Sequence, residues 1–82
     1  MPVKTVTFKR TALKALRRMP SKDSKALVAK LENYAAGGIE DVTELKGADL
    51  LRLRHGEWRA VFKEDGTVIA VVKVAHRREI YR

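Results

Sequence analysis

The segment LRLRHGEWRAVFKEDGTVIAVVKV, residues 51–74, decides the fold. Leucine and arginine alternate over residues 51–54, which predicts a strand with one apolar and one cationic face. After a turn at residues 55–57, a second strand is predicted from Trp58 to Lys63. The Glu-Asp-Gly that follows is a strong hairpin signal. It leads into residues 67–74, which are nearly all β-branched and apolar on both faces, so we expect that strand in the middle of a sheet.

The first half of the chain predicts one strand and two helices. Residues 3–8 alternate and are rich in β-branched side chains, as in a strand. From Thr11 to Met19, apolar residues recur at helical spacing, and Pro20 ends this first helix. A second amphipathic helix follows, for which Ser21 is the expected N-cap and Gly37-Gly38 the expected end.

These elements predict a single α+β domain over residues 1–82. Residues 38–49 are acidic and polar, which indicates a surface connection between the helices and the last three strands. The resulting order is β-α-α-β-β-β. It predicts a helical hairpin packed on one face of a mostly antiparallel four-stranded sheet.

The charge is large and unevenly distributed. The 82 residues carry a formal charge of +8 and a pI near 10.2. Residues 1–30 hold nine lysines and arginines against one acidic residue, and residues 51–82 hold eight against four. Residues 31–50 are instead acidic. Such basic ends favour a polyanionic partner, whether nucleic acid, a membrane surface or an acidic protein.

Several classes of protein are disfavoured. The chain has no cysteine and two histidines, so neither a disulfide framework nor a convincing zinc site is expected. It has no apolar run long enough to span a bilayer, and residues 1–10 lack the apolar region of a signal peptide. A cytoplasmic protein without membrane association, metal or small-molecule cofactor is therefore expected.

Alternation also predicts a shared cationic face. Leu53 and Trp58 should point to the core, which turns their neighbours toward the face that the helices leave uncovered. The residues on that face are Arg52, Arg54 and Arg59, and we expect the C-terminal Arg77, Arg78, Tyr81 and Arg82 to fold over it. A solvated strand face is the simpler alternative for the first two arginines. The convergence of all of them favours an anion site.

The motifs of the second half resemble those of the RelE/ParE toxin superfamily. The matching stretches are LKG at 45–47, LRLR at 51–54, GEWRAVF at 56–62 and VAHRREIYR at 74–82. The resemblance extends over the whole chain, because the first strand and the helical hairpin also lie where the family has them. It implies the RelE-like microbial ribonuclease fold and a cognate antitoxin, which we expect to be acidic.

The resemblance implies one of two activities. RelE-type toxins cut mRNA in the ribosomal A site without a metal ion, by attack of the 2′-hydroxyl on the adjacent phosphate. ParE-type toxins share the fold but act on DNA gyrase. The basic residues match the RelE type, so a toxin that cleaves mRNA and inhibits translation is expected. The matching positions, all implied to be catalytic, are Arg52, Arg54, Arg59, Arg77 and, as the base-stacking residue, Tyr81.

The remaining chemistry concerns proton transfer and RNA binding. Guanidinium is a poor base, so His76 and Tyr81 are the candidates to accept the proton of the 2′-hydroxyl. Other cations are candidates for contact with RNA or the ribosome, although a solvated helix face is the simpler interpretation of those on the first helix. These are Lys9, Arg10, Lys14, Arg17, Arg18, Arg78 and Arg82.

Two alternatives remain open. A non-catalytic gyrase inhibitor would need no such set of arginines, and a plain RNA-binding domain would bind without cleaving. Trp58 is expected in the core rather than as a platform for RNA bases, and His55 is expected to be an ordinary turn residue.

Overall fold

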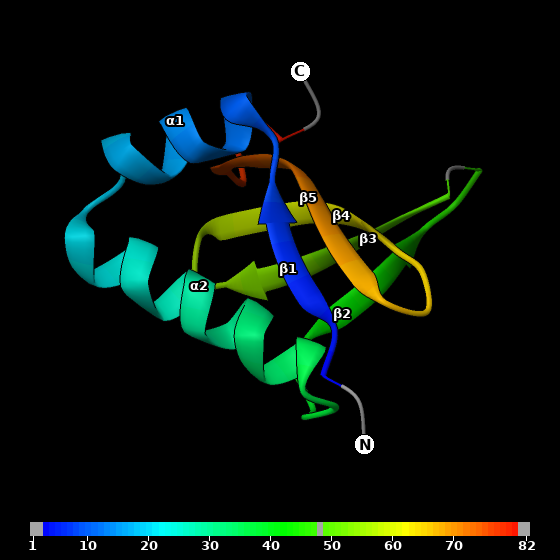
Figure 1. Cartoon of the computed structure of the whole chain (residues 1–82). Helices are drawn as coiled ribbons and strands as arrows, with labels where there is room; N and C mark the ends of the chain where they lie inside the picture. Colours follow the sequence, from blue (N-terminus) through cyan, green and yellow to red (C-terminus); the bar gives the residue numbers. More distant parts are fainter. Residues whose placement is uncertain (1–2, 48, 81–82) are drawn as a thin grey trace.

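The computed structural model describes residues 3–47 and 49–80, and Figure 1 shows two helices lying against a twisted sheet. The elements are β1 (Thr5–Phe8), α1 (Arg10–Arg18), α2 (Ser21–Ala35), β2 (Val42–Leu45), β3 (Leu50–His55), β4 (Trp58–Glu64) and β5 (Val68–His76). The strand order is β1-β5-β4-β3-β2. Only the β1–β5 pair is parallel. The predicted α+β class and mostly antiparallel sheet are confirmed. Strand β5 lies inside the sheet, between β1 and β4, although the middle strand of the five is β4.

The sheet has five strands where the sequence predicted four. The extra strand, β2, lies inside the expected surface connection and pairs antiparallel with β3 from Val42↔Leu53 to Leu45↔Leu50. Val42 packs against the core under the helices, whereas Leu45 packs against the opposite face of the sheet. An exposed pair of polar residues separates its two apolar residues. The segment therefore lacks the alternation of apolar and polar residues that predicts a strand.

The helix ends differ in one detail from the prediction. Pro20 occupies the N-cap position of α2 and Ser21 is already the first helical residue, so the assignment of Ser21 as N-cap is wrong. At the other end Gly37 has a φ of +93°, the left-handed conformation that glycine adopts at little cost, which confirms the predicted stop. Among the described residues, no helix is long and apolar enough to cross a membrane.

The sheet buries side chains on both faces. The larger core lies under the helices and includes Leu27, Leu31 and Phe62. On the other face Val61 and Ala75 pack against Ile80, which is only 5% exposed. The C-terminal segment thus folds back over the uncovered face, as predicted, up to the last described residue. Tyr81 and Arg82 lie outside the described residues.

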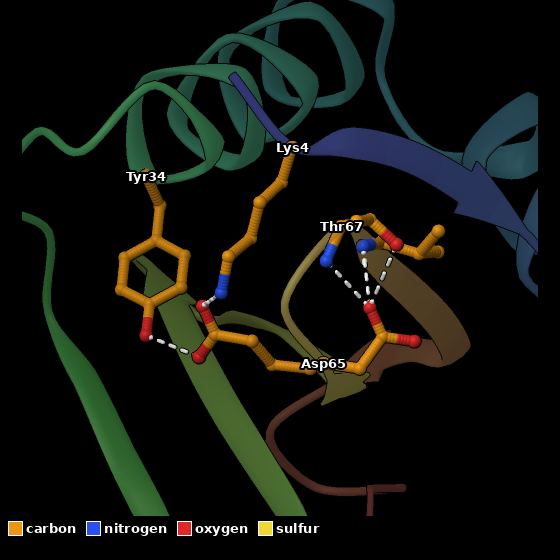
Figure 2. Close-up of polar contacts among 6 residues, drawn as sticks. Lys4, Tyr34, Asp65 and Thr67 are labelled. Atoms are coloured by element: carbon orange, nitrogen blue, oxygen red, sulfur yellow. Dashed lines mark hydrogen bonds and ion pairs between the residues drawn. The ribbon is translucent and has the colours of Figure 1, made fainter. Parts of the chain in front are cut away.

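A polar cluster joins β1, α2 and the end of β4 (Figure 2). Lys4 Nζ lies 2.6 Å from one carboxylate oxygen of Glu64, and the Tyr34 hydroxyl donates a hydrogen bond of 2.9 Å to the other. Partial burial, and then the adjacent Glu64, raises the pKa of Tyr34. The Tyr34 ring also meets Phe62 edge to face at 5.5 Å. These contacts link the start of β1 to α2 and to the end of β4.

The β4–β5 hairpin depends on one carboxylate. Asp65 Oδ1 accepts hydrogen bonds of 2.7 Å from the backbone N–H groups of both Thr67 and Val68, and one of 3.2 Å from the Thr67 hydroxyl (Figure 2). These donors stabilise the ionised carboxylate and lower the pKa of Asp65 below its ordinary value of 3.8. The predicted Glu-Asp-Gly turn is confirmed, and it is closed by a charged acceptor.

This arrangement predicts an acid-sensitive turn. Because the pKa of Asp65 is lower in the folded chain, its contribution to stability is present above about pH 4 and is lost as the pH falls through the folded pKa. Asp65→Asn should therefore melt at a lower temperature than the wild type at pH 7 and show a smaller difference from it at pH 2. Thermal melts across that range test this. Glu32→Gln, on an exposed position of α2, is the control and should follow the wild type. Equal pH dependence of Asp65→Asn and the wild type would contradict the assignment.

Candidate functional site

Three arginines lie on the face of the sheet that the helices leave uncovered, as the alternation predicted. We call this the arginine face, formed by Arg52, Arg54 and Arg59. Arg54 and Arg59 are directly opposite each other across the β3–β4 pair. The side chain of Arg54 is 50% exposed, Arg52 is half-buried and Arg59 is 8% exposed. The face therefore grades from an exposed rim to a buried centre.

Arg59 is buried, although it lies on the face that the helices leave uncovered. Its Nη1 donates hydrogen bonds of 2.7 Å to the carbonyl of Gly56 and 2.9 Å to that of Trp58. The residue opposite it on β5 is the small Ala75, which leaves room for the long side chain to lie along the sheet. Arg59 therefore braces the β3–β4 turn as well as contributing charge.

The positive charges of the arginine face repel one another. Burial, and then repulsion from Arg54 and Arg52, lowers the pKa of Arg59, with a smaller effect of the same sign from Arg77. Glu57 acts in the opposite direction. Guanidinium still stays charged at neutral pH, so the buried cation is held among like charges. A bound anion would relieve this repulsion.

Arg54 and the neighbouring Arg77 each form an ion pair with a carboxylate. Arg77 Nε lies 2.8 Å from Glu57 Oε2, and the Arg77 backbone N–H donates a hydrogen bond of 2.6 Å to the Glu57 carbonyl. Arg54 Nε lies 3.4 Å from Asp41 Oδ2. All four side chains are at least half exposed, so both ion pairs are weak and a phosphate can replace either carboxylate. Glu57 and Asp41 were not singled out from the sequence; only their position in or beside turns hinted at them.

His76 does not join the arginine face. It is paired with Trp58 across β4 and β5, so both side chains lie on the side of the sheet that carries α1. Their rings meet edge to face at 5.4 Å, and His76 Nδ1 accepts a hydrogen bond of 3.3 Å from the Arg78 backbone. Strand β5 continues two residues beyond the predicted end at Val74. Alternation along it therefore sends His76 away from the arginines.

His76 and Trp58 line a groove beside α1, of about 390 Å³, that we call the α1 groove. Lys14 and Arg18 form its cationic rim, and Glu79 contributes from the C-terminal segment. Trp58 is half-buried rather than fully in the core: one part packs against the core and another faces this groove. The expectation of a purely structural tryptophan is therefore incomplete.

The other predicted cations are spread over the surface. All those that the structure describes are exposed: Lys9, Arg10, Lys14, Arg17, Arg18 and Arg78. Only Lys14 and Arg18 among them line the α1 groove. His55, expected to be a simple turn residue, ends β3 and places Nε2 3.2 Å from Asp23 of α2, so it links helix to sheet.

The hydrogen bonds of Arg59 predict a stability cost on its removal. Arg59→Ala leaves two partly buried carbonyls without this donor, which should lower the free energy of unfolding by about 1–3 kcal/mol. The matched control is Arg54→Ala, an equal loss of charge at an exposed position directly opposite, which should change it by less than about 0.5 kcal/mol. Urea denaturation of both variants measures the difference. Equal stability of the two would show that the carbonyl contacts add nothing.

Comparison with known proteins assigns the family. The model of a family described as the ParE toxin of the type II toxin–antitoxin system parDE matches residues 6–81. No curated protein matches the sequence.

Solved toxin–antitoxin structures have a similar fold. The RelB–RelE complex from Methanococcus jannaschii contains a chain with 25% identity and a TM-score of 0.76, covering 92% of this chain and 94% of that one. For the intact RelBE complex of E. coli the identity is 28%, the TM-score 0.71 and the coverage 89% and 95%. The Pyrococcus horikoshii RelE–RelB complex, at 22% identity, covers 94% of this chain and 98% of that one and supports the fold alone, with a TM-score of 0.79.

The arginine face, the helical hairpin and the C-terminal fold-back thus occur in a chain that a single family model spans almost from end to end. The protein belongs to the ParE toxin family, within the RelE/ParE superfamily, and is the toxin of a type II toxin–antitoxin pair.

Proposed function

We propose that this toxin is a ribosome-dependent mRNA endoribonuclease whose arginine face binds the scissile phosphate. The observation that carries the proposal is the buried Arg59, held in the positive field of Arg52 and Arg54 with Arg77 close enough to add to it. Bringing like charges together costs free energy that an anionic ligand returns on binding. Guanidinium groups bind phosphate oxygens bidentately, so a phosphodiester suits this face.

The chemistry assigned to this face is transfer of the phosphoryl group to the neighbouring ribose. The 2′-hydroxyl gives its proton to a base and its oxygen forms a bond to phosphorus, while the bond from phosphorus to the 5′-oxygen breaks. The 5′-oxygen takes a proton from solvent, so the products are a 2′,3′-cyclic phosphate and a free 5′-hydroxyl. Negative charge grows on the non-bridging oxygens, where Arg52 and Arg54 stabilise it. Arg77, released from Glu57, stabilises the leaving 5′-oxygen. Arg59 holds the turn that carries Glu57 and adds positive potential.

The proton of the 2′-hydroxyl needs an acceptor close to the arginine face. His76 faces the α1 groove, so it does not act on a phosphate bound at the arginine face unless the end of β5 moves. Tyr81 follows the buried Ile80 directly in sequence, and its role rests on the resemblance. Glu57, whose carboxylate lies beside Arg77, is a further candidate. We therefore propose Tyr81 or Glu57 as the base.

The second candidate function is inhibition of DNA gyrase without catalysis. It is favoured by the family model itself, whose description is that of ParE. In this alternative the arginine face binds an acidic surface of a protein rather than a phosphate. The two functions differ in what is damaged in the cell, which is mRNA in the first case and DNA in the second.

Induced expression distinguishes the two. We expect growth arrest with mRNA cut inside codons, detected by primer extension and only when ribosomes are present. Arg77→Ala should reduce cleavage about 10²–10³-fold because it removes one donor to the transition state. Lys22→Ala is the control, since it removes one positive charge from an exposed position on α2. Arrest with double-strand DNA breaks and intact mRNA would instead establish the gyrase function.

The antitoxin partner should be acidic, since the toxin carries +8. Opposite charges steer the encounter of two proteins, so the association rate should fall as salt screens them. Stopped-flow mixing of toxin and antitoxin between about 50 and 500 mM salt measures this rate. A rate that stays constant across the range would mean that the excess charge serves another partner.

A further inference from the structure

The α1 groove has no part in the chemistry assigned to the arginine face. Met19 and Val74, both almost fully buried, form part of its floor together with the half-buried Trp58. His76 stands with its ring plane at 84° to that of Trp58. The floor is therefore apolar and aromatic, which suits a flat, poorly hydrated ligand group.

The rim of the groove is cationic on one side. Lys14 and Arg18 are four residues apart on α1, so they lie on the same side of the helix, one turn from each other, and both are exposed. The Thr11 hydroxyl, one turn earlier, also lines the groove and donates a hydrogen bond of 3.5 Å to the Val72 carbonyl. Glu79 comes from the C-terminal segment. A ligand with an anionic end next to α1 and hydrogen-bond donors near Glu79 fits this arrangement.

We propose that the α1 groove binds one nucleotide of single-stranded RNA, with the base against Trp58 and His76 and its phosphate held by Lys14 and Arg18. Bases of single strands bind in this way to aromatic side chains, and cations along the groove follow the backbone. A volume of about 390 Å³ is at the small end for ligand sites and suits one nucleotide. Glu79 accepts a hydrogen bond from the amino group of adenine, cytosine or guanine, which uracil lacks.

The position of the groove links it to the arginine face. His76 lines the groove, and the next residue, Arg77, is paired with Glu57 at the edge of the arginine face. An RNA strand that passes the end of β5 therefore meets the groove and Arg77 in succession. The nucleotide in the groove is then one that flanks the scissile phosphate. This last step rests on the proposed ribonuclease function, whereas binding of RNA in the groove does not.

The single tryptophan of the chain provides the assay, because Trp58 lines the groove. Titration of the free toxin with a short oligoadenylate RNA should quench its fluorescence to saturation, and oligouridylate should bind more weakly. The double variant Lys14→Ala, Arg18→Ala should weaken binding at least about tenfold. It should also make the dependence of log K on log salt less steep by about 0.7, because the two cations hold a single phosphate.

The matched control is the double variant Lys22→Ala, Lys25→Ala, which removes the same number of charges from exposed residues of α2 that do not line the groove. It should bind oligoadenylate as the wild type does, apart from a small general loss. Equal weakening of the two double variants would overturn the proposal, because binding would then depend on net charge alone. Tighter quenching by a polyglutamate peptide than by RNA would also overturn it and would make the groove a protein-docking site.

Cleavage on ribosomes separates this inference from the proposed function. If the groove holds a flanking nucleotide, the variant Lys14→Ala, Arg18→Ala cuts mRNA with altered preference beside the cut, while the control variant retains the wild-type pattern. A wild-type toxin that binds RNA in the groove and cuts none would refute the ribonuclease and leave the nucleotide site intact. Unchanged cleavage and unchanged RNA binding in the groove variant would refute the nucleotide site alone.

Discussion

Both surfaces of the sheet are organised around β5, a strand that needs cover on each of its faces. Ile69, Val71 and Val74 are buried in the core under the helices. On the other face Ala75 is covered by the returning C-terminal segment, where Ile80 is buried and Lys73 Nζ donates a hydrogen bond of 2.9 Å to its carbonyl. The same requirement brings the C-terminal arginines back to the sheet. Burial of β5 therefore also places Arg77 beside the arginine face.

The arginines of this surface have unequal roles because they are unequally solvated. Arg59 is fixed by two carbonyls in a partly dry environment, where its charge is weakly screened. Arg54 and Arg77 are exposed and held only by carboxylates, in contacts worth about 0–1 kcal/mol each. The arginine face therefore combines a centre fixed by hydrogen bonds with a rim whose ion pairs are exchanged at little cost.

Much of the fold could be predicted because its signals are local. Alternation gave the faces of β3 and β4, and the turn residues gave the hairpin at Asp65. Strand β2 could not be found in this way, because Val42 and Leu45 serve different faces and are three residues apart.

The site was predicted less completely than the fold. Alternation states which face a side chain is on, but not whether another segment covers that face. The burial of Arg59 could therefore not be predicted from alternation. The position of His76 on the α1 side of the sheet could not be predicted either, because β5 runs beyond Val74 and the pairing of His76 with Trp58 is a long-range property of the sheet.

The pairing of the first strand with the last has a consequence for the synthesis of the protein. Residues 60 positions apart in the sequence meet in the ion pair between Lys4 and Glu64, and β1 gains its strand partner only when β5 is in place. Contacts over such separations form late in folding and slowly. A growing polypeptide therefore leaves β1 without its strand partner until β5 has been made. The topology of the sheet sets the earliest point in synthesis at which the toxin fold can close.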